Sequence, residues 1–195
     1  MSCIHDLDVD ALRRQYALRN FVETGTHFGD SVQSALDCGF EHVYSCDLME
    51  HVHDAACRRF AQNPRVSLHH ADSIAFLREI LPRLSGPTFF WLDAHFPDHY
   101  GYPCRPEHRF PLAEELRLIA RHRPPTDVIA CDDIRVVADP HNPAFTPGAL
   151  ERGGHAALVV PDVSIEMLAA PLAATHDWRV DLAGEGILLF EPRRA

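Results

Sequence analysis

The sequence predicts an α/β protein built on a doubly wound, mostly parallel sheet. Short apolar runs rich in aromatic and β-branched residues end on a carboxylate at Glu23, Asp47, Asp93 and Asp132, and less cleanly at Asp72. Such runs are typical of strands that are buried on both faces. Segments with helical spacing alternate with them, and this alternation favours parallel strands joined by helical crossovers. Two further strand-like runs close the chain and indicate an antiparallel hairpin.

Glycine and proline residues separate the expected elements, and no repeat or shift in composition divides them. The predicted strands cover 20–24, 41–47, 66–70, 88–93 and 127–132, the predicted helices cover 6–19, 30–38, 50–62, 73–84 and 111–122, and the hairpin strands cover 177–182 and 187–191. A chain of 195 residues can bury a substantial core in one piece. We therefore expect a single domain over 1–195.

Two long segments interrupt this pattern, at 94–110 and at 134–160. Both leave the carboxyl edge of the predicted sheet, one after the fourth strand and one after the fifth. Long connections at that edge usually carry function. We expect them to be active-site loops.

Composition and charge narrow the classes of partner. The chain carries 18 Lys+Arg against 28 Asp+Glu, a net charge of −10, which disfavours nucleic acid and anionic membrane surfaces. There is no apolar run of about 20 residues and no signal-peptide core. Six cysteines without a CxxC pair fit a reduced, cytoplasmic protein. A small-molecule substrate is the expected partner, and a homodimer is compatible with all of this.

All 18 basic residues are arginine, so the chain lacks lysine altogether. This excludes a Walker-A phosphate loop, a Schiff-base lysine and a lysine general base. The glycine-rich turn after the first predicted strand follows the pattern ExGxxxG, with Glu23, Gly25 and Gly29. It differs from the GxGxxG dinucleotide fingerprint. Asp47, at the end of the second strand, is placed to accept hydrogen bonds from ribose hydroxyls.

These motifs, in this order and spacing, resemble the class I S-adenosylmethionine-dependent methyltransferases. The segment 23–29 looks like their first motif, Asp47 like their ribose-binding acid, and the segment 70–73 like their adenine loop. The terminal hairpin looks like the family's added antiparallel strand. Over residues 20–191 the resemblance implies a Rossmann-like methyltransferase fold and S-adenosylmethionine as cofactor. The cofactor-binding residues that it implies are Glu23, Gly25, Thr26, Gly29, Asp47, Asp72 and Ser73.

A narrower resemblance is to the cation-dependent O-methyltransferases, which place one acid after strand 4 and a pair after strand 5. It implies a divalent-metal site at Asp93, Asp132 and Asp133. Three converging carboxylates repel one another unless a cation neutralises them, and oxygen ligands suit Mg²⁺, Mn²⁺ or Ca²⁺. Ligation by His95 as well would favour Mn²⁺ or Fe²⁺. The alternative is that Asp132 caps a turn and Asp133 is solvated.

The general base is left open by the sequence. Where the catechol-type enzymes carry a lysine, three residues past the strand-4 acid, this chain has Phe96. The candidate catalytic residues are His95, His99 and Asp93, with His27 as a further candidate base, because histidine titrates near neutrality. Alternatively, a metal lowers the pKa of the acceptor hydroxyl and makes a strong base unnecessary.

The leading expectation is therefore methyl transfer from S-adenosylmethionine to a small molecule, with metal-assisted O-methylation. One alternative keeps the cofactor but transfers the methyl group to nitrogen, or transfers another alkyl group, without a metal. A nucleotide-dependent oxidoreductase is disfavoured by the ExGxxxG turn and the hairpin. A non-enzymatic, His-rich metal-binding protein would have no use for the series Glu23, Asp47 and Asp72.

Overall fold

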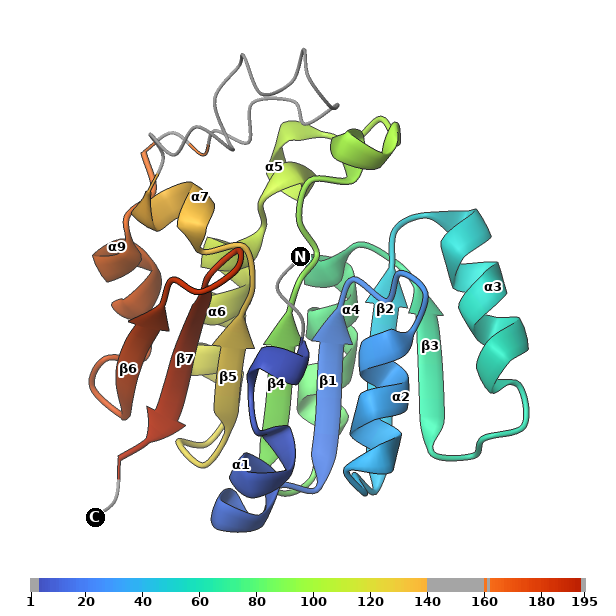
Figure 1. The fold of residues 1–195 in the computed structure, drawn as a ribbon, viewed down its shortest axis with the longest axis horizontal. Coiled ribbons are helices and arrows are strands. Elements are labelled where there is room, and N and C mark those ends of the chain that lie inside the picture. Colours follow the sequence, from blue (N-terminus) through green and yellow to red (C-terminus); the bar gives the residue numbers. More distant parts are fainter. Residues whose placement is uncertain (1–3, 140–159, 161, 194–195) are drawn as a thin grey trace.

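The computed structural model describes residues 4–139, 160 and 162–193. Seven strands form one sheet in the order β3-β2-β1-β4-β5-β7-β6 (Figure 1). Their bounds are β1 Asn20–Thr24, β2 His42–Asp47, β3 Val66–His70, β4 Thr88–Leu92, β5 Val128–Cys131, β6 His176–Asp181 and β7 Ile187–Pro192. Strands β1 to β5 are parallel, whereas β7 runs antiparallel to both β5 and β6. The predicted doubly wound, mostly parallel sheet and its terminal hairpin are confirmed.

Helices cover both faces of the sheet because successive strand residues point to opposite sides. In β4, Phe89 packs in one core with α1 (Val9–Tyr16), α2 (Asp30–Asp37) and Phe60 of α3 (Glu50–Phe60). Its neighbour Phe90 packs in the other core with α4 (Ser73–Ile80), α6 (Leu112–His122) and α9 (Ile165–Ala169). Burying each such side chain stabilises the fold by roughly 1.5–3 kcal/mol.

Two of the predicted helices differ from the observed ones by more than two residues at an end, whereas the other three agree within two residues. The predicted helix over 6–19 is a short 3₁₀ turn, η1 (Ile4–Asp6), followed by α1, because Asp8 caps α1 by accepting from the Ala11 N–H and Ala17 turns left-handed. The predicted helix over 73–84 ends as α4 at Ile80 and continues as the 3₁₀ turn η2 (Leu81–Arg83). Pro82 has no N–H to extend the α-helical ladder.

The described parts of the two long segments contain short helices that the sequence pattern did not predict. Segment 94–110 holds η3 (Pro97–Tyr100) and α5 (Pro106–Arg109). Segment 134–160 begins with α7 (Arg135–Ala138), and its residues 140–159 lie outside the described residues. Helix α9 was also not predicted. Among the described residues, no helix combines the length and the apolar character needed to cross a bilayer.

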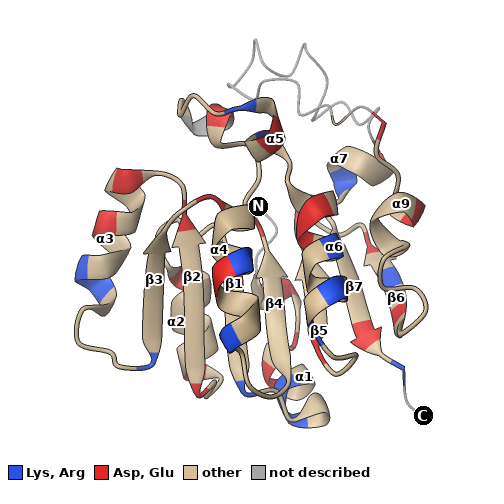
Figure 2. Cartoon of the chain, turned by 180° about the vertical axis from the view of Figure 1, so that it is seen from behind, with Lys and Arg blue, Asp and Glu red and all other residues tan. Residues whose placement is uncertain are grey.

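The strand register brings the chemically distinctive residues to one edge. Thr24 pairs with Cys46 and with Leu92, and Leu92 pairs with Cys131. The next residue of each strand is therefore in line with its neighbours. Acidic residues also occupy the first turns of α3 and α6, with basic residues in their last turns, so this edge of the molecule is the more acidic (Figure 2).

Candidate functional site

A cavity of about 340 Å³ opens at the carboxyl edge of the parallel strands. Residues that follow β1, β2, β3, β4 and β5 all contribute to its wall, as ligand sites in open α/β sheets do. The cavity is lined by Gly25, His27, Cys46, Asp47, Leu48, Met49, Ala71, Asp72, Ser73, Ile74, Asp93, Ala94, His95, Phe96, Pro97, His108, Pro111, Asp132, Asp133 and Glu185.

One end of the cavity, which we call the β2 end, is formed by Asp47, Asp72 and Ser73. Both carboxylate oxygens of Asp47 accept backbone hydrogen bonds, from the His27 N–H at 2.9 Å and from the Met49 N–H at 2.8 Å. Asp72 caps α4 by accepting from the Ala75 N–H at 2.9 Å. The carboxylates at this end are thus held in place by the fold itself before any ligand arrives.

Gly25 lies midway along the cavity and must be glycine. Its φ is +92°, and a Cβ built there would lie 2.5 Å from the carbonyl oxygen of Asp93. The backbone after β1 therefore passes directly against the backbone after β4. This close approach of the two backbones excludes any side chain at position 25.

Three of the residues implied by the resemblance lie beneath the cavity and not in its wall. Glu23 is fully buried and accepts hydrogen bonds from the hydroxyls of Ser31 and Ser45. Burial raises the pKa of Glu23 to about 8. Thr26 is bonded to Ser45 through their hydroxyls, and Gly29 turns against the ring of Phe60. These residues support the loop that Gly25 presents.

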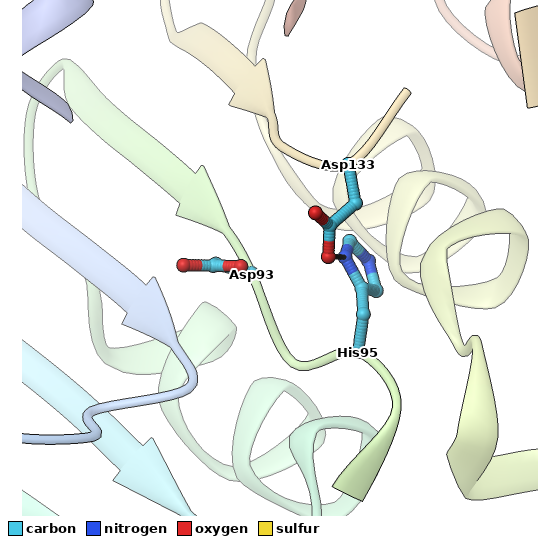
Figure 3. A group of neighbouring side chains, drawn as sticks. All are labelled: Asp93, His95 and Asp133. Atoms are coloured by element: carbon cyan, nitrogen blue, oxygen red, sulfur yellow. Dashed lines mark ion pairs between the residues drawn. The ribbon is translucent and has the colours of Figure 1, made fainter. Parts of the chain in front are cut away.

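The other end of the cavity holds a cluster that we call the acid–histidine cluster: Asp93, His95 and Asp133. One potential ligand atom from each lies within 4.8 Å of the other two. The imidazole of His95 faces Asp133, with Nδ1 3.4 Å from Oδ2, and its side chain is fully buried (Figure 3). Two carboxylates and one imidazole suit Mn²⁺, Fe²⁺ or Zn²⁺.

Charge repulsion is concentrated in this cluster. The pKa of Asp93 is raised well above its usual value by burial and then by the carboxylates of Asp132 and Asp133. A cation between these groups would remove the repulsion. The donor set therefore fits a divalent metal ion.

Asp132 follows β5 and lines the same cavity as Asp93 and Asp133. It is buried, and its Oδ1 accepts a hydrogen bond from the Asp133 N–H at 2.8 Å. The compact group of Asp93 and Asp133 also contains His95, which the sequence offered as an additional ligand. Asp133 has φ +60°, so the backbone makes a left-handed turn at the second acid of the pair.

The backbone beside His95 is strained. Phe96 has φ +51°, a conformation that is rare for a bulky residue. Phe96 is nevertheless buried against Phe110, and the Arg109 guanidinium lies 4.9 Å from its ring centroid. Such strain persists only where the surroundings impose it and is common at functional sites.

The other candidate residues differ in whether they line the cavity. His27 lines the cavity, as does His108, which the sequence did not single out. The side chain of His99 lies outside the described residues. Arg135, which follows the acid pair by two residues, donates to the Gly184 carbonyl at 2.9 Å and lies 3.7 Å from Asp139.

Two acidic residues at the site were missed. Glu185 of the hairpin turn lines the cavity. Glu115 is fully buried on α6, and it lies on the same stripe as the apolar residues Leu112, Leu116 and Ile119. A carboxylate at a core position of an amphipathic helix was the available signal for Glu115.

No protein-family model matches the sequence, and no curated protein matches it. Solved structures do match. A putative caffeoyl-CoA O-methyltransferase from Staphylococcus aureus is 11% identical with a TM-score of 0.63, over 99% of this chain and 85% of that one. The O-methyltransferase TomG from Streptomyces achromogenes, solved with SAM, is 17% identical with a TM-score of 0.61, over 100% and 82%. An O-methyltransferase from Bacillus cereus, solved with SAH, is 16% identical with a TM-score of 0.59, over 99% and 82%. The chain therefore has the fold of the S-adenosylmethionine-dependent methyltransferases.

Proposed function

We propose that this protein transfers a methyl group from S-adenosylmethionine to an oxygen atom of a small-molecule acceptor, with a divalent cation held at the acid–histidine cluster. The observation that carries the proposal is the continuity of one cavity. It joins the β2 end, suited to a nucleoside, to a cluster suited to a metal ion, on a fold shared with O-methyltransferases. Neither end alone would specify the reaction.

At the β2 end, Asp47 would accept hydrogen bonds from the ribose hydroxyls, and Ser73 and Ile74 would contact the base. The pre-set carboxylate of Asp47 needs no reorganisation to do this, which lowers the cost of binding. The cavity wall at Gly25, where the chains after β1 and β4 meet, would contact the amino-acid portion. The acidic wall also favours a positively charged sulfonium.

At the other end, Asp93, His95 and Asp133 would bind the cation and hold the acceptor in line with the methyl group. A bound cation supplies Lewis acidity that lowers the pKa of an acceptor hydroxyl. This chain has no lysine that could act as the base instead. Because the His95 side chain is fully buried in the cluster, we favour the ligand role for it over the role of general base.

Calorimetry tests the two halves separately. S-adenosylhomocysteine should bind the chelated protein, and Mn²⁺ should bind the cofactor-free protein, each at one site. Methyl transfer from labelled S-adenosylmethionine to catechol-type and other vicinal hydroxyl compounds should be lost on chelation and return with Mn²⁺ or Mg²⁺. An unrelated Mn²⁺-binding protein, such as an EF-hand protein, is chelated and reloaded in the same way. It serves as the control for chelator that is carried over into the assay.

Each half can fail on its own. If the protein does not bind S-adenosylhomocysteine, the proposal that it transfers methyl groups is wrong. Full turnover after exhaustive chelation would instead leave a metal-free methyltransferase, with His95 or His27 as base or with nitrogen as the acceptor atom. Mass spectrometry of the methylated product separates oxygen from nitrogen acceptors.

A further inference from the structure

A carboxylate is buried on α6, the helix that follows the chain after the acid–histidine cluster. Glu115 is fully buried, and among the described residues neither of its oxygens has a donor in hydrogen-bonding geometry, although the hydroxyls of Ser73 and Thr24 lie close enough to lower its pKa. Burying a carboxylate in this way is costly, and an apolar side chain would fill the same stripe at less cost. A role beyond packing is therefore expected for Glu115.

The imidazole of His95 is also buried without a hydrogen-bond partner among the described residues. Its side chain is fully buried, and within the described part of the chain neither Nδ1 nor Nε2 has a hydrogen-bond partner. Nδ1 is the nitrogen that faces Asp133, at 3.4 Å. That leaves Nε2 on the other side of the ring, away from Asp133. Histidines that ligate a metal through one nitrogen usually donate the other N–H to a carboxylate or carbonyl.

The chain after β4 is packed on the start of α6. The Phe96 N–H donates to the Arg109 carbonyl at 2.8 Å, and the Phe110 ring stacks on the His95 imidazole with 4.6 Å between centroids. Pro111, which precedes α6, lines the cavity. The pKa of Glu115 is raised by burial and lowered in part by His95, which places the two groups within electrostatic reach.

We propose that Glu115 is a positioning residue, whose carboxylate accepts the Nε2–H of His95 and so directs Nδ1 toward the cation site beside Asp93 and Asp133. This inference rests on the cation site of the proposed function. It adds a residue that touches neither the cation nor the cavity. When the cation is bound, the pair Glu115–His95 closes to a hydrogen bond, and both orphaned groups are satisfied at once.

A different role for Glu115 makes a different prediction. The hydroxyls of Ser73 and Thr24 also lie near Glu115, and Ser73 lines the β2 end of the cavity. If Glu115 served to order that end, its removal would weaken S-adenosylhomocysteine binding and leave Mn²⁺ binding intact.

The test compares Glu115→Leu with Glu114→Leu, because leucine has no atom that could accept the His95 N–H. Glu114 is the adjacent residue on α6, but its side chain is partly exposed and pairs with Arg78 and Arg117, so its variant removes the same charge without touching His95. We expect Glu115→Leu to raise the Kd for Mn²⁺ by about 10- to 100-fold, the usual cost of losing an outer-shell partner. Glu114→Leu should match wild type, and S-adenosylhomocysteine affinity should be unchanged in both. Unaltered Mn²⁺ affinity in Glu115→Leu, or a loss confined to S-adenosylhomocysteine, overturns the proposal.

A second measurement uses the unaltered protein and does not depend on the variant folding. The ring ¹⁵N signals of His95 in the Mg²⁺-loaded protein, assigned by comparison with His95→Gln, report which nitrogen carries the proton. We expect protonation at Nε2, and protonation at Nδ1 overturns the proposal.

The proposed function fails in ways that can be told apart from this. If wild type binds no Mn²⁺ or Mg²⁺, the cation site falls and the role of Glu115 falls with it. If the metal results are as expected but S-adenosylhomocysteine does not bind, methyl transfer is lost while the Glu115–His95 pairing stands.

Discussion

The two ends of the cavity differ in how far the protein satisfies its own polar groups. At the β2 end, both oxygens of Asp47 accept backbone N–H groups and Asp72 caps a helix. At the acid–histidine cluster, Asp93 is repelled by its neighbours and His95 lacks a hydrogen-bond partner among the described residues. One end is complete without a ligand and the other is not.

This difference indicates how each end would bind. A pre-satisfied site orders little on binding, so it contributes affinity without a large conformational cost. A site of mutually repelling acids is unfavourable until a cation arrives, so much of the binding energy comes from relieving that repulsion. Substitutions should therefore act separately on the two ends.

The largest effect is expected at the acid–histidine cluster. Asp93→Asn and Asp133→Asn each replace a charged ligand with a neutral amide, so the Kd for Mn²⁺ measured by calorimetry should rise by at least about 100-fold, above the cost of losing an outer-shell partner. S-adenosylhomocysteine affinity should be kept. Asp132→Asn is the comparison variant: asparagine retains the oxygen that accepts the Asp133 N–H, but one of the charges that repel Asp93 is lost, so a smaller rise in Kd is expected. An equal loss of Mn²⁺ affinity in Asp132→Asn would instead support Asp93, Asp132 and Asp133 as the ligand set.

The next effect is at the β2 end. Asp47→Ala should weaken S-adenosylhomocysteine binding by about 10- to 100-fold, since losing a charged hydrogen-bond acceptor costs roughly 1.5–3 kcal/mol. Mn²⁺ affinity should not change. Glu50→Ala, an exposed acid at the start of α3, is the charge control. If folded Asp47→Ala binds S-adenosylhomocysteine as tightly as wild type does, the β2 end is not the nucleoside site that we describe.

A smaller effect follows from Glu23 below the cavity. Because its pKa rises from 4.5 to about 8 on folding, the native state holds a proton that the unfolded state releases. This contribution to the free energy of unfolding is full below about pH 4.5 and is lost as pH rises toward 8. Denaturation at pH 6 and 7 should show a loss of up to about 1.4 kcal/mol from this residue. Glu23→Gln should reduce the slope, whereas an unchanged slope would assign it to other buried acids.

The smallest effect concerns Asp72. Asp72→Ala removes the cap of α4 and should lower stability by about 1 kcal/mol and the melting temperature by about 2–4 °C. Asp72→Asn should keep the cap. S-adenosylhomocysteine affinity should fall less than in Asp47→Ala. A larger loss of affinity than of stability would give Asp72 a direct contact with the cofactor.

The sequence was sufficient to predict the strands and the edge of the sheet at which they end. Phe89–Phe90–Trp91–Leu92 is apolar throughout because both faces of β4 are buried, and Asp93 is the first residue after the strand. The order of such segments along the chain is enough to place them at one edge. It is not enough to show that His95 and Asp133 meet there.

Which side chains meet at this edge depends on backbone features that the local sequence does not indicate. The left-handed turn at Asp133 and the strained backbone at Phe96 determine which carboxylate meets His95, and both are imposed by packing between distant segments. Glu115 lies on a helix that was correctly predicted, but its partner is twenty positions earlier in the chain. Only the three-dimensional arrangement shows that neither group has a partner in hydrogen-bonding geometry within the described part of the chain.

The contact between Gly25 and the Asp93 carbonyl has a consequence for energetics. Because a Cβ at position 25 would lie only 2.5 Å from that oxygen, the two backbones are too close to move independently. If a bound cation displaced Asp93, the loop that would bind the cofactor would have to move with it. Linkage then requires reciprocity: the factor by which Mn²⁺ changes the affinity for S-adenosylhomocysteine equals the factor by which S-adenosylhomocysteine changes the affinity for Mn²⁺. A single glycine would thus set the coupling between two ligands that never share a side chain.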